Sequence, residues 1–225
     1  MRKIFIPTDG EIDWKAFLID PEKQWAKGYS ARTLAHAWED ADGFPPEVAD
    51  VFNKCRLLAS IKPLLIFPEW KVPLPGGSTS SQNDIWVLAE CDSGLVSITV
   101  EGKVNEPFDK TIGDWILKAS EGKRERLTHL ADILGLKEPI HGSIYYQLLH
   151  RTASAVIEAE RFGATQAVML VHSFSPTNKW FEEFRAFVAL FKGATEVGKI
   201  STVKVKDNMS PHLAWVHGDE RFLNA

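Results

Sequence analysis

The stretch Ser81-Gln82-Asn83-Asp84-Ile85-Trp86-Val87-Leu88-Ala89-Glu90, followed by Leu95-Val96-Ser97-Ile98-Thr99-Val100-Glu101-Gly102-Lys103, sets the architecture of this chain. We expect two β-strands joined by a turn at 91–94, because Asp, Ser and Gly favour tight turns. Side chains alternate between the two faces of a strand, so Glu101 and Lys103 project from one face with only Gly102 between them. If the strands pair across the turn, Asp84 comes near both. Two carboxylates and one amine then converge at one end of the hairpin, an arrangement that suits Mg²⁺ or Mn²⁺.

This arrangement resembles the active site of the PD-(D/E)XK nuclease superfamily of restriction-endonuclease-like enzymes. Asp84 matches the isolated Asp of that motif and Glu101-Gly102-Lys103 its E-x-K tripeptide, whereas Asn83 replaces the usual Pro. The resemblance implies that Asp84, Glu101 and the carbonyl of Gly102 bind the metal and that Lys103 positions the attacking water. A D…ExK pattern alone is weak, but here the Asp opens one strand and the ExK closes the next. The alternative is a surface hairpin whose exposed face carries ordinary charges.

Four further residues are candidates for the same site. Many members of the superfamily carry an extra metal-binding acid on the first helix or strand, and Glu69 is the best-placed match. A solvated charge on an edge segment explains Glu69 equally well. Several branches place a Gln on the next core helix, near the metal or the scissile phosphate, and Gln147 matches that placement by role. His150 and Arg151 lie one turn further along and are candidates for nucleic-acid contact, with a structural role as the alternative.

The rest of the chain predicts one α/β (α+β) domain over residues 1–225, with a mixed central sheet flanked by helices. The motifs around Asp84, Glu101 and Gln147 are also similar to an uncharacterised bacterial branch of the superfamily, which implies a restriction-endonuclease-like core at about 30–175. We expect Pro68 to end a short apolar run at 64–67, and the loop at 75–80 to be a flexible connection. The other expected elements are helices at 30–43, 45–58, 143–163 and 180–191, strands at 166–171, 200–205 and 213–216, and a helical insertion at 105–142.

Composition limits the classes of function. The 225 residues are 44% hydrophobic and 25% charged, as in an ordinary globular protein. Cys55 and Cys91 have no metal or redox spacing, so we expect a cytoplasmic protein. The apolar start ends at Pro7, too short for a signal peptide, and no stretch approaches a membrane span. The net charge of −4 gives no general attraction for nucleic acid, so binding of DNA must depend on a local basic surface.

Three functions compete at this stage. The first is Mg²⁺- or Mn²⁺-dependent hydrolysis of phosphodiester bonds in nucleic acid, with DNA as the expected substrate. The second is a non-catalytic nucleic-acid- or protein-binding module that retains the nuclease fold. The third, a small-molecule hydrolase without metal, lacks a nucleophile elbow and a Ser–His–Asp pattern. The complete Asp/Glu/Lys set favours the first function, and the acidic net charge favours the second.

Overall fold

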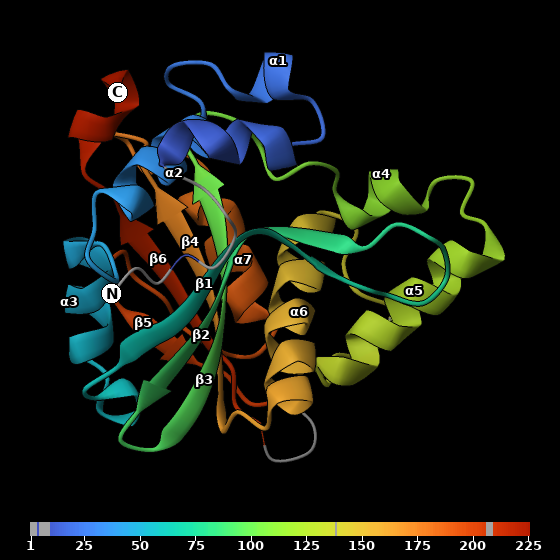
Figure 1. Ribbon diagram of the computed structural model, residues 1–225. Coiled ribbons are helices and arrows are strands. Elements are labelled where there is room, and N and C mark those ends of the chain that lie inside the picture. The colour runs from blue at the N-terminus through green and yellow to red at the C-terminus, as the bar shows by residue number, and fades with distance from the viewer. Residues whose placement is uncertain (1–3, 5–9, 138, 206–208) are drawn as a thin grey trace.

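The computed structural model describes residues 4, 10–137, 139–205 and 209–225, and a mixed sheet runs through their centre (Figure 1). Among these residues six strands form one open sheet in the order β1-β2-β3-β4-β6-β5. Strands β1 to β3 are antiparallel, β4 and β6 run parallel to β3, and β5 is antiparallel to β6. The strands are β1 (Lys62–Val72), β2 (Ser81–Cys91), β3 (Gly94–Lys103), β4 (Gln166–Ser173), β5 (Ile200–Thr202) and β6 (His212–His217).

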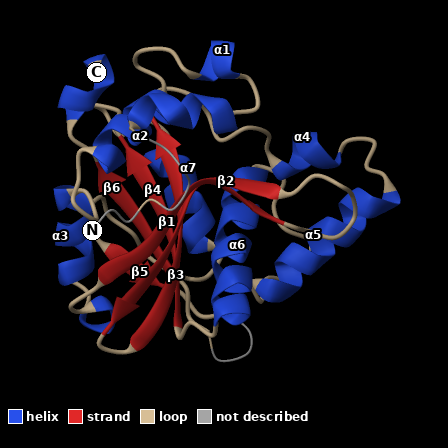
Figure 2. Ribbon diagram, viewed as in Figure 1, coloured by secondary structure: helices blue, strands red, loops and turns tan. Residues whose placement is uncertain are grey.

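Helices cover both faces of this sheet (Figure 2). Helices α2 (Ser30–Glu39) and α3 (Pro46–Asn53) pack on one face, in a core that joins Leu34 and Phe52 to Ile98. Helices α6 (Tyr146–Phe162) and α7 (Phe181–Ala189) pack on the other, where Leu148 and Phe184 share a core with Met169. The remaining helices are α1 (Pro21–Gln24), α4 (Ile112–Ile116), α5 (Glu121–Ile133) and the 3₁₀ turns η1 (Glu11–Phe17), η2 (Arg56–Leu58) and η3 (Glu220–Asn224). No helix among the described residues combines the length and apolar content needed to cross a membrane.

The predicted hairpin is present as β2 and β3. Cys91 pairs with Gly94 at the turn, and Ile85 pairs with Val100, so Asp84 reaches the register of Glu101. The polar face of β3 is nevertheless buried, because β4 pairs with β3 on its other side and α6 covers that face. Glu101 is 2% exposed and Lys103 3% exposed. The alternative of a solvated surface hairpin is therefore wrong.

Several predicted boundaries are wrong for identifiable reasons. Pro68 does not end an element, because β1 is the edge strand, where a missing backbone N–H removes no ladder hydrogen bond. Ser30 does not cap α2 through its side chain, and its own N–H donates to Oε1 of Glu106 at 2.8 Å. Helix α6 begins at Tyr146 rather than at 143, although Gly163 ends it in the left-handed conformation as expected.

The loop at 75–80 is not a flexible connection. A Cβ added at Gly76 would lie 1.9 Å from the carbonyl oxygen of Gly122, so the loop backbone packs directly on the first turn of α5. Arg126 of the same helix donates hydrogen bonds to the carbonyl oxygens of Pro75 at 2.7 Å and of Gly77 at 3.4 Å. The loop therefore has one docked position, which glycine permits because it has no side chain.

Candidate functional site

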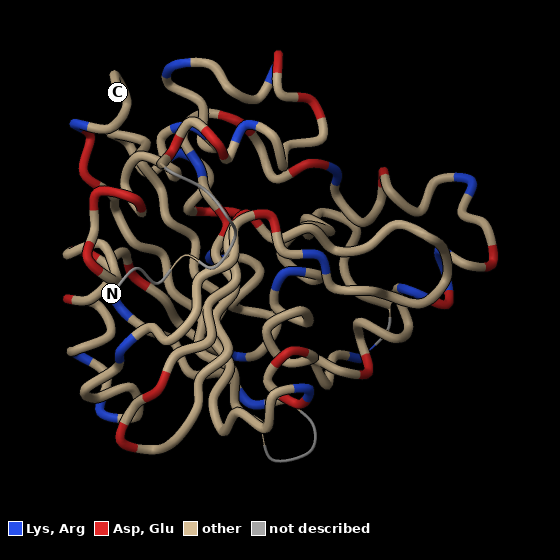
Figure 3. The backbone as a smooth tube through the Cα atoms, in the orientation of Figure 1, with Lys and Arg blue, Asp and Glu red and all other residues tan. Residues whose placement is uncertain are grey.

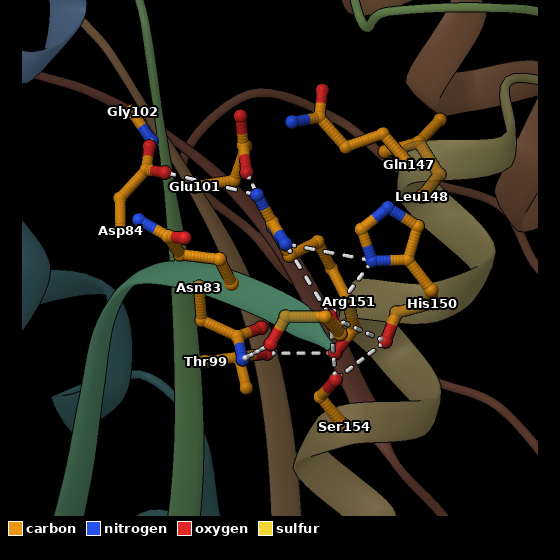
Figure 4. Close-up of polar contacts among 12 residues, drawn as sticks. Asn83, Asp84, Thr99, Glu101, Gly102, Gln147, Leu148, His150, Arg151 and Ser154 are labelled. Carbon is orange, nitrogen blue, oxygen red and sulfur yellow. Dashed lines mark hydrogen bonds and ion pairs between the residues drawn. The ribbon is translucent and has the colours of Figure 1, made fainter. Parts of the chain in front are cut away.

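The candidate site lies where the end of β3 meets the start of β2 and the first two turns of α6. Asp84, Glu101, Gln147 and Arg151 point toward one another from these three elements (Figure 4). Together with Lys103 they line a pocket of about 370 Å³. The structure therefore brings together the carboxylates, the lysine and the glutamine that the sequence predicts for one site.

Glu101 is the centre of this cluster. Its Oε1 accepts a hydrogen bond from Nζ of Lys103 at 2.6 Å, and its Oε2 accepts one from Nε of Arg151 at 2.6 Å. Burial raises the pKa of the Glu101 carboxyl, but the two cations outweigh it and hold that pKa below its ordinary value. Glu101 is therefore a buried carboxylate with a positive charge against each oxygen.

Asp84 is held differently. Its Oδ2 accepts the backbone N–H of Gly102 at 2.7 Å, and its Oδ1 lies 3.8 Å from Nη2 of Arg151. Burial and the neighbouring charge of Glu101 raise the pKa of Asp84 to about 7. The resemblance implied that the carbonyl of Gly102 is a metal ligand, which stays a prediction. The structure shows in addition that the N–H of Gly102 orients Asp84.

Glu69 belongs to the same pocket although it comes from the edge strand. Its Oε2 accepts a hydrogen bond from Nε2 of Gln82 at 2.7 Å. Burial and the charge of Asp84 raise the pKa of Glu69 to about 8. Glu69 is therefore not a solvated edge charge. Gln82, which sequence reasoning missed, shares the strand face of Asp84 by simple alternation.

The start of α6 is placed as predicted. Oε1 of Gln147 accepts a hydrogen bond from Nζ of Lys103 at 3.2 Å, while Leu148 is fully buried in the core. Arg151 lines the pocket with its guanidinium turned to Glu101 and Asp84. Lys103 is thus held between a carboxylate and an amide, and Arg151 is engaged by acids of the protein itself.

His150 does not line this pocket. Its Nδ1 lies 2.7 Å from Oγ of Ser81, and the residue lines a second pocket on the other side of Arg151. Burial and the charges of Arg151 and Arg126 lower the pKa of His150 well below its ordinary value, so the imidazole is neutral. His150 is therefore a half-buried, neutral hydrogen-bonding residue outside the carboxylate pocket.

Residues before α2 also wall the site, which sequence reasoning did not anticipate. Leu18, Lys23 and Tyr29 line the pocket, as does Glu106, whose carboxylate accepts the Ser30 N–H. No sequence motif in the N-terminal segment indicates this role. Its place follows from the packing of η1 on α2 and β1.

The donor chemistry of the pocket suits a cation. Glu69, Asp84, Glu101 and Glu106 supply four carboxylates against the three cations Lys23, Lys103 and Arg151, and the pKa values of Glu69 and Asp84 are raised. Hard oxygen donors of this kind are those that Mg²⁺ prefers. As arranged, the described residues contain no group of three or more His, Cys, Asp or Glu positioned to hold a metal ion, and Arg151 lies against Glu101. Metal binding by Glu101 therefore requires Arg151 to share or release that carboxylate.

Comparison with known proteins gives a family without an assigned activity. A family model described as "Domain of unknown function (DUF6946)" matches residues 7–220. No curated protein and no solved structure matches the chain.

Proposed function

The chain belongs to the family described as "Domain of unknown function (DUF6946)", and we propose that it is a Mg²⁺- or Mn²⁺-dependent nuclease that hydrolyses phosphodiester bonds in DNA. The observation that carries this proposal is the meeting of Asp84, Glu101, Lys103 and Gln147 in one pocket. The order β1-β2-β3-β4, with β4 parallel to β3 after α6, supports a restriction-endonuclease-like core. Both features agree with the D…ExK pattern of the hairpin.

The carboxylates of Asp84 and Glu69, together with Glu101, would hold the metal. A bound divalent cation stabilises charge on the phosphate and makes a coordinated water more acidic. Two of these acids are disfavoured as free carboxylates, because burial and mutual repulsion raise their pKa values to about 7 and about 8. Close carboxylates of this kind are stabilised in the ionised form by a nearby cation.

Lys103 and Arg151 have separate tasks in this proposal. The ammonium of Lys103, held by Glu101 and Gln147, orients the attacking water and offsets negative charge that builds on the phosphate. Arg151 holds Glu101 at its second oxygen and limits repulsion with Asp84. Gln147 keeps the lysine directed into the pocket rather than toward the core.

Cleavage of single- and double-stranded DNA with and without Mg²⁺ or Mn²⁺ tests the proposal. We expect Lys103→Met and Asp84→Asn each to reduce the rate by at least about 100-fold. Lys103→Met should retain metal affinity, because Lys103 is not a ligand, whereas Asp84→Asn should weaken it. Glu90→Gln is the matched control, since Glu90 is exposed near the far end of β2. If Asp84→Asn leaves the rate of DNA cleavage unchanged, the carboxylate pocket is not the catalytic site.

One observation favours the second candidate function, a non-catalytic nucleic-acid- or protein-binding module. The guanidinium of Arg151 lies 2.6 Å from Glu101 and 3.8 Å from Asp84, where it neutralises the acids without a metal. In such a module metal titration would show no binding, and no DNA would be cleaved. Arg151→Gln separates the two functions. It should raise the metal affinity of a nuclease, whereas a binding module should bind no metal before or after the substitution.

A further inference from the structure

A second pocket, of about 390 Å³, borders the carboxylate pocket. Tyr146 and His150 of α6 line this second pocket, whereas their neighbours Gln147 and Arg151 line the first. Nη1 of Arg151 lies 3.3 Å from Oγ of Ser81, which also lines the second pocket. The two pockets are therefore separated by a single wall of side chains.

A buried arginine faces this second pocket without a carboxylate partner. Arg126 is 8% exposed, and the hydrogen bonds of its guanidinium to the main chain go to the carbonyl oxygens of Pro75, Leu74 and Gly77. No carboxylate of the described residues forms an ion pair with it. Carbonyl oxygens satisfy the hydrogen bonds but leave the positive charge unbalanced, and a buried charge without a counter-ion is unfavourable. The pocket therefore favours an anion.

A second cation is fixed at the same pocket. Nζ of Lys123 donates to the carbonyl oxygen of Trp115 at 2.8 Å and lies 5.1 Å from the centre of its ring. Tyr146 stacks on that ring with 4.0 Å between the ring centres, which holds the wall in place. Asp109 also lines the pocket, but it is exposed and sits at the rim. The acidic first pocket and the basic second pocket thus lie side by side.

The pocket is built rather than formed by chance contact of mobile segments. The close approach of Gly76 to Gly122 fixes the loop that forms one side. Thr79, Ser80 and Ser81, which all carry hydroxyl groups, line the same pocket. Hydroxyls beside a guanidinium and an ammonium are the donors that proteins use to hold phosphate oxygens.

We propose that this second pocket binds a phosphate group of the nucleic-acid strand next to the phosphodiester that lies in the carboxylate pocket. This inference rests on the proposed nuclease function and names how the strand is held. It also explains how a chain with a net charge of −4 can attract DNA locally. Arg126 and Lys123 bind the phosphate, and the strand crosses the wall at Ser81 and Tyr146 toward Asp84.

The test measures binding of fluorescent single-stranded and duplex oligonucleotides at several salt concentrations, without divalent metal so that no cleavage occurs. We expect Lys123→Gln to weaken binding several-fold and to reduce the slope of log affinity against log salt by about 1, as loss of one phosphate contact does. Arg124→Gln is the matched control. It removes the same charge from an exposed residue of the same helix outside the pocket, and the slope should stay as in the unaltered protein.

Equal slopes for Lys123→Gln and Arg124→Gln would overturn the inference, as would failure of the unaltered protein to bind any oligonucleotide. The result is independent of the cleavage assay. If DNA is cleaved but Lys123→Gln binds normally, the nuclease proposal stands and the phosphate pocket is wrong. If Lys123→Gln changes the slope but no DNA is cleaved, the pocket stands and the catalytic proposal fails.

Discussion

Single residues of the site differ in what they contribute to stability, because Glu101 is fully paired and Asp84 is not. Glu101→Gln leaves Lys103 and Arg151 buried without a full counter-charge, so we expect a loss of about 3 kcal/mol or more. Asp84→Asn removes a carboxylate whose pKa burial and Glu101 raise to about 7, so stability at pH 8 should be unchanged or higher. Glu101 is 2% exposed, so its substitution threatens the fold even though it lies on the polar face of the hairpin. Urea unfolding of the metal-free variants measures both effects. Equal destabilisation by the two substitutions would contradict the conclusion that Glu101 is fully paired and Asp84 is not.

Glu69 predicts an unusual dependence of stability on pH. Its pKa is raised from 4.5 to about 8 in the folded protein, so folding favours its protonated form. The contribution of this group is present below pH 4.5 and is lost as the pH rises toward 8. Glu69→Gln should therefore be more stable than the unaltered metal-free protein at pH 8, by at least about 1 kcal/mol, and should show no such advantage at pH 4.5. Glu90→Gln is the matched control. An equal gain in stability at pH 8 in both variants would show that the gain does not come from the raised pKa of Glu69.

At the scale of elements, the loop at 75–80 depends on the contact between two backbones. Gly76 and Gly163 both have positive φ, of 76° and 65°, so alanine strains both to a similar extent, about 1 kcal/mol. Only Gly76 meets a neighbour, the Gly122 carbonyl, whereas a Cβ at Gly163 meets nothing within 4 Å. We expect Gly76→Ala to cost about 1–3 kcal/mol more than Gly163→Ala in urea unfolding. Equal costs would mean that the loop is not docked on α5.

At the scale of the whole molecule, the N-terminal segment closes the site from outside the sheet. Trp14 of η1 is 3% exposed and donates its indole N–H to Glu39 at 2.9 Å. We expect Trp14→Ala to cost about 3–5 kcal/mol and to increase proteolysis within residues 10–29, because the segment loses its anchor. Ile12→Ala is the control, since Ile12 is 63% exposed in the same turn and should change stability by less than about 0.5 kcal/mol. Protection from protease that persists in Trp14→Ala would show that other contacts hold the segment.

Charge is also a property of the whole molecule. Acidic and basic positions are scattered over the whole fold in Figure 3, and the net charge of the chain is −4. This net charge gives no general attraction for duplex DNA. In the proposed nuclease, the electrostatic features that matter are the two adjoining pockets, one acidic and one basic.

The sequence by itself determined the elements whose signals are local. The alternation in Ser97–Lys103 and the turn at 91–94 predicted the hairpin and the meeting of Asp84 with Glu101, because strand period and turn chemistry depend on neighbouring residues. The stripe before Gly163 predicted α6 and the direction of Gln147 and Leu148 for the same reason. Helix starts depended on the tertiary structure as well, since caps compete with tertiary partners such as Glu106.

Only the tertiary structure decided which side chains are buried and which charges are paired. Arg151 meets Glu101 across 50 residues. Arg126, which has no ion pair with any residue that the structure describes, meets a loop about 50 residues before it. Glu69 enters the site because β1 is an edge strand beside β2, and the N-terminal segment walls the pocket because Trp14 anchors it. These facts lie outside the reach of sequence patterns, because burial and the balance of charge depend on segments that are far apart in the chain and meet only in the packed fold.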